Sequence, residues 1–496
     1  MRPPRTVHLR RPLLALLALA LAWGIVPSAS GGSADSTTLG SRVDTFVGAY
    51  LDRHRLPGAT VAVVHDGRVV HESGYGHDAD GRDLTATTRM RLASGSKPVT
   101  ALAVLQLVQD GRVDLDAPVV RYLPDFETED GREDGVTVRH LLAQTSGLPN
   151  PTVVPPARTL REAAERTRSL RLSTAPGTRY AYSNANYWVA ARLVEVVSGR
   201  DFSSYLRDRV FAPLGMERSV NRTNTADAVP GLARGHVTAW GGSVAVGSVD
   251  QTVSGAGGVI STAHDMGLWL AAQQRDGRAP DGTSVLSPGL VRESHHAQPG
   301  TDGVGLGWDG DVTESGRPRV GYSGVDASGW SSRQDLVPGT GYGVVVLANS
   351  TSPTIEHPYE LSSGVLELTE GGEPDLGTPV AVLVDLALGA TTLLVLAAGV
   401  VGVGRAGRWA ARRRGRRAWR SALRLVPLGV APAAAVALFG VAPSLQDNSL
   451  TPTDVFWLFP SATGLLAALA AASTAVLVTR GWWMARRRPA RGTVTT

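Results

Sequence analysis

Two apolar runs joined by a turn mark the start of a folded region near residue 58. In ATVAVVHDGRVVHESGYG (59–76), β-branched residues lie on both sides of Asp66-Gly67. An Asp-Gly pair between two such runs predicts a β-hairpin, because both turn positions need a positive φ. A third apolar run, YGVVVLA at 342–348, predicts a buried strand far along the chain.

Helical patterns fill the sequence between these strands. Residues 94–110 are apolar on most faces and end before Gly111, which predicts a helix buried in a core. Residues 186–198 form an amphipathic pattern that stops at Gly199, a residue typical of helix ends. Strands from both ends of a region with helices between them predict an α+β fold, in which an antiparallel sheet carries a helical insertion.

Three long apolar stretches follow a short linker at 370–379. Each stretch is close to the roughly 20 residues that cross a bilayer as a helix. The sequence therefore predicts three transmembrane helices, at residues 380–404, 425–443 and 455–479.

The arginines around these stretches predict their orientation. Residues 405–424 carry nine arginines and residues 480–496 carry five, with no acidic residue in either segment. Positively charged segments next to membrane spans stay in the cytoplasm, so both are assigned there. The loop at 444–454 carries two aspartates and no basic residue, which places it outside. The pattern predicts a multi-pass protein of the cell membrane with a cytoplasmic C-terminus.

The N-terminus has the pattern of a secretory signal peptide. Four arginines precede a 14-residue apolar run, and small residues follow it up to Ser30. Such a run is short for a membrane span, so residues 1–30 are predicted to be a signal peptide, and an uncleaved anchor is the alternative. Export by this signal would place residues 31–369 on the extracytoplasmic side, in agreement with the arginine pattern.

The excess of basic residues belongs to the membrane-related segments. Region 31–379 contains 31 basic and 41 acidic residues, although the whole chain has a net charge of +5. Nucleic-acid binding depends on positive charge, so no nucleic acid is expected as a partner of this region. The absence of cysteine excludes disulfides, thiol catalysis and cysteine-based metal sites.

Lys97 is the single lysine of the chain, and all other basic residues among the 49 are arginines. Arginine stays charged in proteins, whereas a buried lysine can give up its proton and act as a base. Ser94 lies three residues earlier, a spacing that brings two side chains together on a helix. A serine needs an adjacent base to become a nucleophile, so Ser94 and Lys97 are a candidate catalytic pair. A helix cap is the alternative role for Ser94.

SGSK (94–97) and several later segments resemble one family in the family's own order. HLLAQTSGLP (140–149), YSNANYWVAARLVEVVSG (182–199) and GAGGVISTAHDM (255–266) follow it. Together they resemble the serine β-lactamase and penicillin-binding-protein superfamily, in particular the branch of class C β-lactamases, D-alanyl-D-alanine carboxypeptidases and related esterases. The resemblance covers about residues 40–350 and implies the α+β fold of that superfamily.

The resemblance also implies roles for four residues. Ser94 would attack a carbonyl and form an acyl-enzyme, while Lys97 and Tyr182 would share the proton transfers. Asn184 would hold the substrate amide or Lys97, and the backbone N–H of Ser94 would form half of an oxyanion hole. The alternatives are a core tyrosine for Tyr182 and a turn residue for Asn184.

The third motif departs from the family pattern. The usual Lys-Thr-Gly or His-x-Gly is matched by Tyr322-Ser323-Gly324. The resemblance implies that Gly324 permits a close backbone approach, that Ser323 donates to the substrate and that the N–H of Val325 completes the oxyanion hole. Tyr322 brings no positive charge for a substrate carboxylate, so Arg333 is a candidate to supply the missing cation. The alternative role for Tyr322 is packing within the strand. This favours an ester or peptide substrate over a β-lactam.

These features predict a membrane-anchored, extracytoplasmic serine hydrolase that acts through an acyl-enzyme on a D-alanyl peptide, a cell-wall ester or a small ester or amide. Peptidoglycan is a candidate partner, and no cofactor or metal is expected. Two alternatives stay open: a non-hydrolytic penicillin-binding or cell-wall-fragment-sensing module, and a membrane protein whose spans carry the function. His264, His295 and His296 lack metal-ligand spacing and are expected to be surface or capping residues.

Overall fold

The structure is a computed structural model of the 496-residue chain. It describes residues 38–150, 157–247, 252–326, 328–352, 355–413, 417–438 and 459–486. The predicted signal peptide and the predicted outer loop at 444–454 lie outside these residues.

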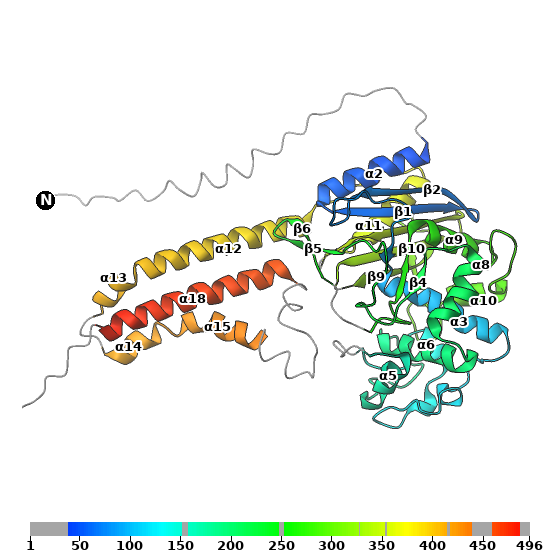
Figure 1. The fold of residues 1–496 in the computed structure, drawn as a ribbon, viewed down its shortest axis with the longest axis horizontal. Coiled ribbons are helices and arrows are strands. Elements are labelled where there is room, and N and C mark those ends of the chain that lie inside the picture. The colour runs from blue at the N-terminus through cyan, green and yellow to red at the C-terminus, as the bar shows by residue number, and fades with distance from the viewer. Residues whose placement is uncertain are drawn as a thin grey trace, which may run out of the picture. The chain divides into compact units, whose positions relative to one another are not determined.

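A six-stranded antiparallel sheet carries strands from both ends of the folded domain (Figure 1). The strand order is β2-β1-β11-β10-β9-β8, and every neighbouring pair is antiparallel. The strands are β1 (Gly58–His65), β2 (Arg68–Gly76), β8 (Asp309–Val312), β9 (Pro318–Asp326), β10 (Trp330–Val337) and β11 (Tyr342–Ala348). The predicted α+β domain, with a sheet built from both of its ends, is therefore confirmed.

The predicted hairpin and the predicted final strand meet at the middle of this sheet. The turn between β1 and β2 consists of Asp66 (φ 48°) and Gly67 (φ 75°), two left-handed positions, as a type I′ turn requires. Strand β1 then pairs with β11 along its length, with Val61 opposite Val346. The first and last regions of the domain are therefore joined by a continuous ladder of backbone hydrogen bonds.

Alternation along the central strands divides the core into two layers. Val61 and Val63 of β1 face one layer, and Ala62 and Val64 face the other. The first layer is covered by α2 (Leu39–His54) and α11 (His357–Thr369). The second, larger layer contains α9 (Ala263–Gln274) and the rest of the helical insertion, which lies on that side of the sheet.

The helical insertion is built around two buried helices. Helix α3 (Lys97–Gln109) is buried on most faces, as its apolar sequence predicts, but it follows a 3₁₀ turn, η1 (Ala93–Ser96). Helix α6 (Asn184–Ser198) ends at Gly199, whose φ is 73°. The shorter helices are α4 (Val138–Leu142), α5 (Leu160–Glu165), α7 (Phe202–Leu206), α8 (Ala212–Leu214) and α10 (Pro288–His295), with η2 (Val119–Arg121), η3 (Glu133–Gly135), η4 (Arg166–Ser169) and η5 (Arg207–Phe211).

Two small sheets complete the domain. One contains β3 (Met90–Arg91), β7 (Val259–Ser261) and β4 (Val220–Asn221); the other contains β12 (Ser350–Thr351), β5 (His236–Ala239) and β6 (Gly242–Ala245). In the first sheet, the N–H of Leu92 donates to the carbonyl of Val259 at 2.9 Å. This bond fixes the backbone directly before Ser94 to the segment that follows GAGG.

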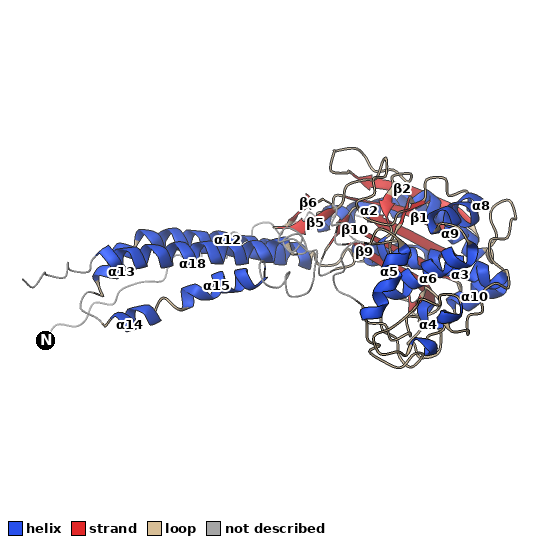
Figure 2. Ribbon diagram, turned by 60° about the horizontal axis from the view of Figure 1, so that its bottom comes forward, coloured by secondary structure: helices blue, strands red, loops and turns tan. Residues whose placement is uncertain are grey.

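Two helices in the C-terminal part are long and apolar enough to span a membrane. They are α12 (Val380–Gly404) and α18 (Pro460–Arg486), and they lie side by side (Figure 2). A Cβ added to Gly399 or Gly402 of α12 would come within 2.7 Å of the side chain of Ala472 or Val476. Small residues that permit such close packing are typical of helix pairs in membranes.

The prediction of three spanning helices is confirmed only in part, because two helices of sufficient length are present in the described residues. The middle stretch contains α15 (Pro427–Val436), a helix of ten residues with Pro432 inside it. Proline lacks the N–H that continues a helix, and ten residues do not cross a bilayer. Helix α18 also runs beyond the predicted span into the segment from 480. The basic segment contains α13 (Ala406–Ala411) and α14 (Ala418–Leu423).

Candidate active site

Ser94 lies in a strained turn at the start of α3. The preceding residue, Ala93, has a φ of 47°, in the left-handed region that residues with a side chain rarely adopt. The turn leads directly into α3, so Ser94 lies at the positive end of that helix. Its Oγ is 2.7 Å from the phenol oxygen of Tyr182 and does not cap the helix. The capping alternative for Ser94 is therefore not supported.

Lys97 is fully buried at the centre of a cluster of hydrogen bonds. Its Nζ lies 3.0 Å from Ser94 Oγ, 2.7 Å from the Tyr182 oxygen, 2.9 Å from Asn184 Oδ1 and 3.0 Å from the carbonyl oxygen of Ala256. An ammonium has three protons, so four partners cannot each receive one of their own. Either one proton is shared, or a hydroxyl donates to a neutral amine, which is the arrangement that a base needs.

Burial also changes the acidity of Lys97. Loss of solvation lowers the pKa of Lys97 from its usual value, and the neighbouring Tyr182 partly opposes this shift. A lower pKa increases the share of neutral amine near neutral pH. An arginine at this position would stay charged, so the use of a lysine has a physical reason here.

The start of α6 directs Tyr182 and Asn184 toward Lys97. Ser183 caps the helix with its side chain, so Tyr182 lies just before the helix and Asn184 is its first residue. The Tyr182 hydroxyl lies 3.0 Å from Asn184 Oδ1 and donates to it in the hydrogen-bond pattern of the structure. Both side chains therefore belong to the Ser94 cluster, and the alternatives of a core tyrosine and a turn residue are not supported.

The third motif lies on an open edge of the sheet beside Ser94. Strand β8 pairs only with residues 318–321 of β9, which leaves the edge uncovered by β8 from Tyr322 onward. A Cβ added to Gly324 would come within 2.0 Å of the carbonyl oxygen of Leu92 and 2.6 Å of the nitrogen of Gly95. Gly324 therefore permits the close backbone approach that its expected role requires. Tyr322 is buried, with 4% of its surface exposed.

The same approach brings two backbone segments together at the site. Val325 follows Gly324 directly, and Ser94 precedes Gly95. The side chain of Val325 is exposed at the open edge. This placement fits an oxyanion hole formed by the N–H groups of Ser94 and Val325, because such a hole needs two backbone donors on one side of a carbonyl oxygen.

Arg333 does not present a free charge to the site. It is 5% exposed, and its Nε lies 2.9 Å from Asp335 Oδ2. Its Nη1 donates to Ser323 Oγ at 3.2 Å, and its guanidinium lies 4.9 Å from the centre of the Tyr359 ring. Arg333 therefore positions the hydroxyl of Ser323. Its positive charge is neutralised by Asp335, so Arg333 does not replace the cation that is missing from the third motif.

Two side chains of β10 hold the Ser94 turn and were missed in the sequence analysis. Ser332 Oγ donates to the carbonyl of Leu92 at 2.6 Å, and Gln334 Nε2 donates to the carbonyl of Gly95 at 2.9 Å. The two residues are two positions apart, so they share a face of the strand. The sequence signal for this role is a run of five consecutive polar residues inside WSSRQDLV (330–337), a segment that forms a buried strand.

Asp309 is a further residue of the site that sequence reasoning missed. It is the first residue of β8 and directly follows residues 305–308, the segment GLGW. Its Oδ1 is buried and has no hydrogen-bond donor among the described residues. Burial raises the pKa of Asp309 to about 6, although Arg333 and then Lys97 pull the pKa down.

A family model described as Beta-lactamase matches residues 43–362, which is more than half of the chain. The chain belongs to the beta-lactamase family. This confirms the resemblance drawn from SGSK and the later segments, and it confirms the general class of serine hydrolases and penicillin-binding proteins.

Relatives of this beta-lactamase-family protein include two bacterial proteins. Protein flp of Staphylococcus aureus (strain MW2) is 27% identical over 337 residues, which are 63% of this chain and 63% of that protein. Penicillin-binding protein 4 of Amycolatopsis lactamdurans is 31% identical over 322 residues, 61% of this chain and 83% of that protein. The match with protein flp thus spans less than two thirds of its length.

A solved structure supports the fold. The octameric penicillin-binding protein homologue from Pyrococcus abyssi has a TM-score of 0.57 at 24% sequence identity, covering 67% of this chain and 78% of that one. A likeness at this identity shows the shared fold, and the geometry around Ser94 must be argued from this chain itself.

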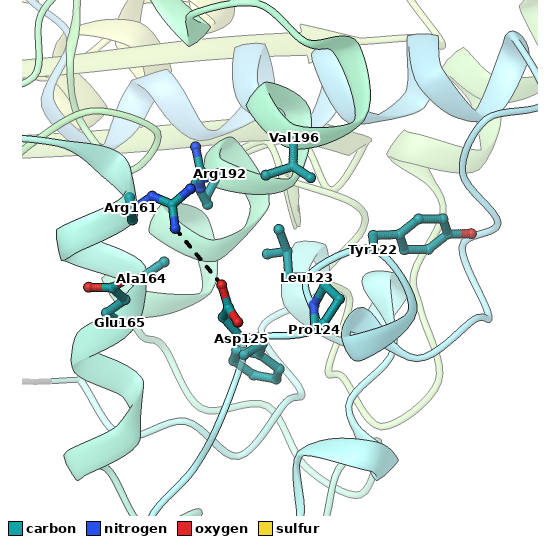
Figure 3. A pocket seen from close by; sticks show the side chains of 10 residues that line it. Tyr122, Leu123, Pro124, Asp125, Arg161, Ala164, Glu165, Arg192 and Val196 are labelled. Atoms are coloured by element: carbon teal, nitrogen blue, oxygen red, sulfur yellow. Dashed lines mark ion pairs between the residues drawn. The ribbon is translucent and has the colours of Figure 1, made fainter.

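A separate pocket of about 160 Å³ lies in the helical insertion (Figure 3). It is lined by Tyr122, Leu123, Pro124, Asp125, Phe126, Arg161, Ala164, Glu165, Arg192 and Val196. Arg161 and Asp125 form an ion pair at 3.9 Å within it, and Arg192 and Val196 come from α6. None of the predicted site residues lines this pocket, so it is distinct from the Ser94 cluster.

The histidines do not form a metal site in the described part of the chain, where no group of three or more ligating side chains is present. His264 instead lies 2.9 Å from Glu72. His295 packs edge-on against Trp308, and burial lowers the pKa of His295 to about 4. His295 is the last residue of α10 and is half-buried, with its ring against the core.

Proposed function

We propose that this protein is a membrane-anchored serine hydrolase that forms an acyl-enzyme on Ser94. The observation that carries the proposal is the position of Lys97 Nζ, 3.0 Å from Ser94 Oγ and 2.7 Å from the Tyr182 oxygen inside a buried cluster. A hydroxyl nucleophile and a base that can lose its charge are the two groups that acyl transfer through serine requires.

In the proposed reaction, Ser94 Oγ attacks the substrate carbonyl carbon while its proton passes to Tyr182 or directly to Lys97. The carbonyl oxygen becomes an oxyanion, and the N–H groups of Ser94 and Val325 stabilise it. When the tetrahedral intermediate collapses, the bond to the leaving group breaks, and the leaving group takes the proton. Water then attacks the acyl-enzyme, gives its proton to the same pair and releases the acid, which restores Ser94.

Two features support a membrane anchor with the domain outside. Helices α12 and α18 are long and apolar enough to span a membrane, and ten residues separate the end of α11 from the start of α12. The arginines of 405–424 follow α12 directly, as expected for a cytoplasmic segment. Residues 39–369 would then lie on the extracytoplasmic side, where cell-wall peptides and esters are candidate substrates.

The third motif favours an ester or amide substrate over a β-lactam. A cation that would hold the carboxylate of a β-lactam is replaced by buried Tyr322, and Arg333 is paired with Asp335. The relatives include penicillin-binding proteins, so stable acylation by a penicillin is the outcome that would support the alternative of a non-hydrolytic binding module.

The test is the intact mass of the full chain in detergent after incubation with a small ester or with a penicillin. We expect an ester-derived adduct that appears and decays, that is absent in Ser94→Ala and that remains in the surface control Ser315→Ala. A penicillin adduct that persists without turnover would favour the binding module. An adduct that forms equally in Ser94→Ala would show that Ser94 is not the nucleophile.

A further inference from the structure

Asp309 lies where the GLGW segment joins the third motif. Its register partner on β9 is Gly321, the residue directly before Tyr322. The segment leading to it packs on α3, since a Cβ added to Gly307 would come within 3.1 Å of the carbonyl oxygen of Lys97. Asp309 therefore lies between α3, which carries Lys97, and the part of β9 that β8 leaves uncovered.

One oxygen of the Asp309 carboxylate lacks a hydrogen-bond donor in the described part of the chain. Its Oδ1 is buried without a hydrogen-bond donor among the described residues, whereas the residue as a whole is partly exposed. A buried polar atom without a partner is unusual in folded proteins and marks a position where a ligand or another group can supply the missing donor. With a pKa raised by burial to about 6, the carboxyl is mostly charged at neutral pH.

The charged and titratable groups around Asp309 come from several elements. They are Lys97 of α3, Tyr187 of α6, Tyr180, Asp311 of β8, Tyr322 of β9, Arg333 of β10 and Glu356 before α11. Two of these charges are already paired, because Arg333 contacts Asp335 and Asp311 contacts Arg319 at 2.7 Å. When Lys97 acts as the base it is neutral, and in that form Asp309 leaves the site with an uncompensated negative charge.

An uncompensated carboxylate repels a substrate carboxylate and attracts a substrate ammonium. We infer that Asp309 is a specificity-determining residue that binds a protonated amine of the substrate, so that the enzyme prefers acyl substrates with an ammonium group within a few bonds of the scissile carbonyl. This inference rests on the proposed function, in which Ser94 is acylated. It names the substrate class of the same site: amino esters or amino amides in place of substrates that end in a carboxylate.

The test uses two matched pairs of esters with the full chain in detergent at pH 7.5. In the first pair, the amine is on the acyl side: an ethyl ester of D-alanine and its N-acetyl derivative. In the second pair, it is on the leaving-group side: the butyrate ester of 2-aminoethanol and its N-acetyl derivative. The readout is the ratio of kcat/KM between the free amine and the acetylated partner, measured for the wild-type chain, Asp309→Asn and Asp302→Asn.

We expect a free-amine preference in at least one pair, which Asp309→Asn reduces roughly 10- to 100-fold, the range of a hydrogen bond to a charged group. Asp302→Asn removes a charge from an exposed position on the same segment and is expected to leave the ratio unchanged. Below pH 6 the preference should fall in the wild type as Asp309 takes up a proton, and Asp309→Asn should lack this fall.

Three outcomes distinguish the failure of this inference from the failure of the proposed function. Equal turnover of the free and acetylated esters by the wild-type chain overturns the role of Asp309 and leaves the hydrolase intact. If Asp309→Asn keeps the preference for the free amine, the role of Asp309 is likewise overturned and the hydrolase assignment is unaffected. If none of the four esters acylates Ser94, the proposed function fails, and the inference about Asp309 fails with it.

Discussion

Lys97 Nζ lies 2.7 Å from the phenol oxygen of Tyr182, although 85 residues separate the two in the chain. The pair is enclosed by Asn184 and the carbonyl of Ala256, and the lysine is fully buried. A neutral amine in this position can receive a proton from Ser94 directly or through Tyr182, which is why the arrangement suits acyl transfer.

The rate of acylation should rise with pH as Lys97 loses its proton. Burial lowers the pKa of Lys97, so the neutral base accumulates at a lower pH than for an exposed lysine, and the rising limb should lie below the usual lysine value near 10.5. The measurement is kcat/KM against pH for a neutral ester. Lys97→Arg should be at least ~100-fold slower and lack this limb, because arginine keeps its proton. A Lys97→Arg chain with near-normal activity would contradict the role.

Loss of the Tyr182 hydroxyl should slow acylation with little effect on folding. Tyr182→Phe removes the group that contacts Ser94 and Lys97, and we expect a loss of roughly 100-fold or more in kcat/KM. Tyr180→Phe is the matched control, two residues earlier and outside the hydrogen-bond cluster of Ser94. Similar losses in both variants would show that the effect is structural; thermal unfolding measured beside activity checks this.

Gly324→Ala should disrupt the site through the backbone. The added Cβ would lie 2.0 Å from the carbonyl oxygen of Leu92, so the strand or the Ser94 turn must move. We expect a loss of stability of roughly 1–3 kcal/mol together with loss of acylation. Gly339→Ala is the control, because a Cβ there meets nothing within 4 Å. An active, stable Gly324→Ala chain would mean that the close approach is not needed.

Buried His357 should make the domain sensitive to acid. Burial lowers the pKa of His357 to about 3, and the unfolded value is near 6.5, so protonation favours the unfolded chain as pH falls below 6.5. At pH 5 the loss should be about 2 kcal/mol. We expect His357→Asn to flatten the fall of the melting temperature between pH 7 and 5, and surface His77→Asn to leave it unchanged. If the melting temperature falls equally with pH in His357→Asn and in the wild type, His357 is not the cause of the acid sensitivity.

The absence of cysteine makes the membrane topology directly testable. A single cysteine at Asp281, on the surface of the domain, should react with a membrane-impermeant maleimide on intact cells. A cysteine at Arg412, in the basic segment after α12, should react only after the cells are opened. Labelling of both positions, or of neither, on intact cells would contradict the proposed orientation.

Several parts of the fold could be predicted because their signals are local. The Asp66-Gly67 turn follows from the φ angles of two neighbouring residues, and Gly199 ends α6 for the same reason. Strand β11 coincides with the apolar run at 342–348. By contrast, the apolar composition of 425–443 suggested a span, whereas α15 covers ten of these residues and contains Pro432.

The candidate chemistry follows from the order of residues: one lysine three residues after a serine, in a chain that otherwise uses arginine, points to a base that must lose its charge. The groups that surround this base become visible only in the folded chain. Strand register places Ser332 and Gln334 against the Ser94 turn and pairs Arg333 with Ser323. Asp309 Oδ1 is buried and has no hydrogen-bond donor among the residues that the structure describes. The contacts of Ser332 and Gln334 join segments about 240 residues apart, and the local pattern of the sequence does not show which distant segments fold together.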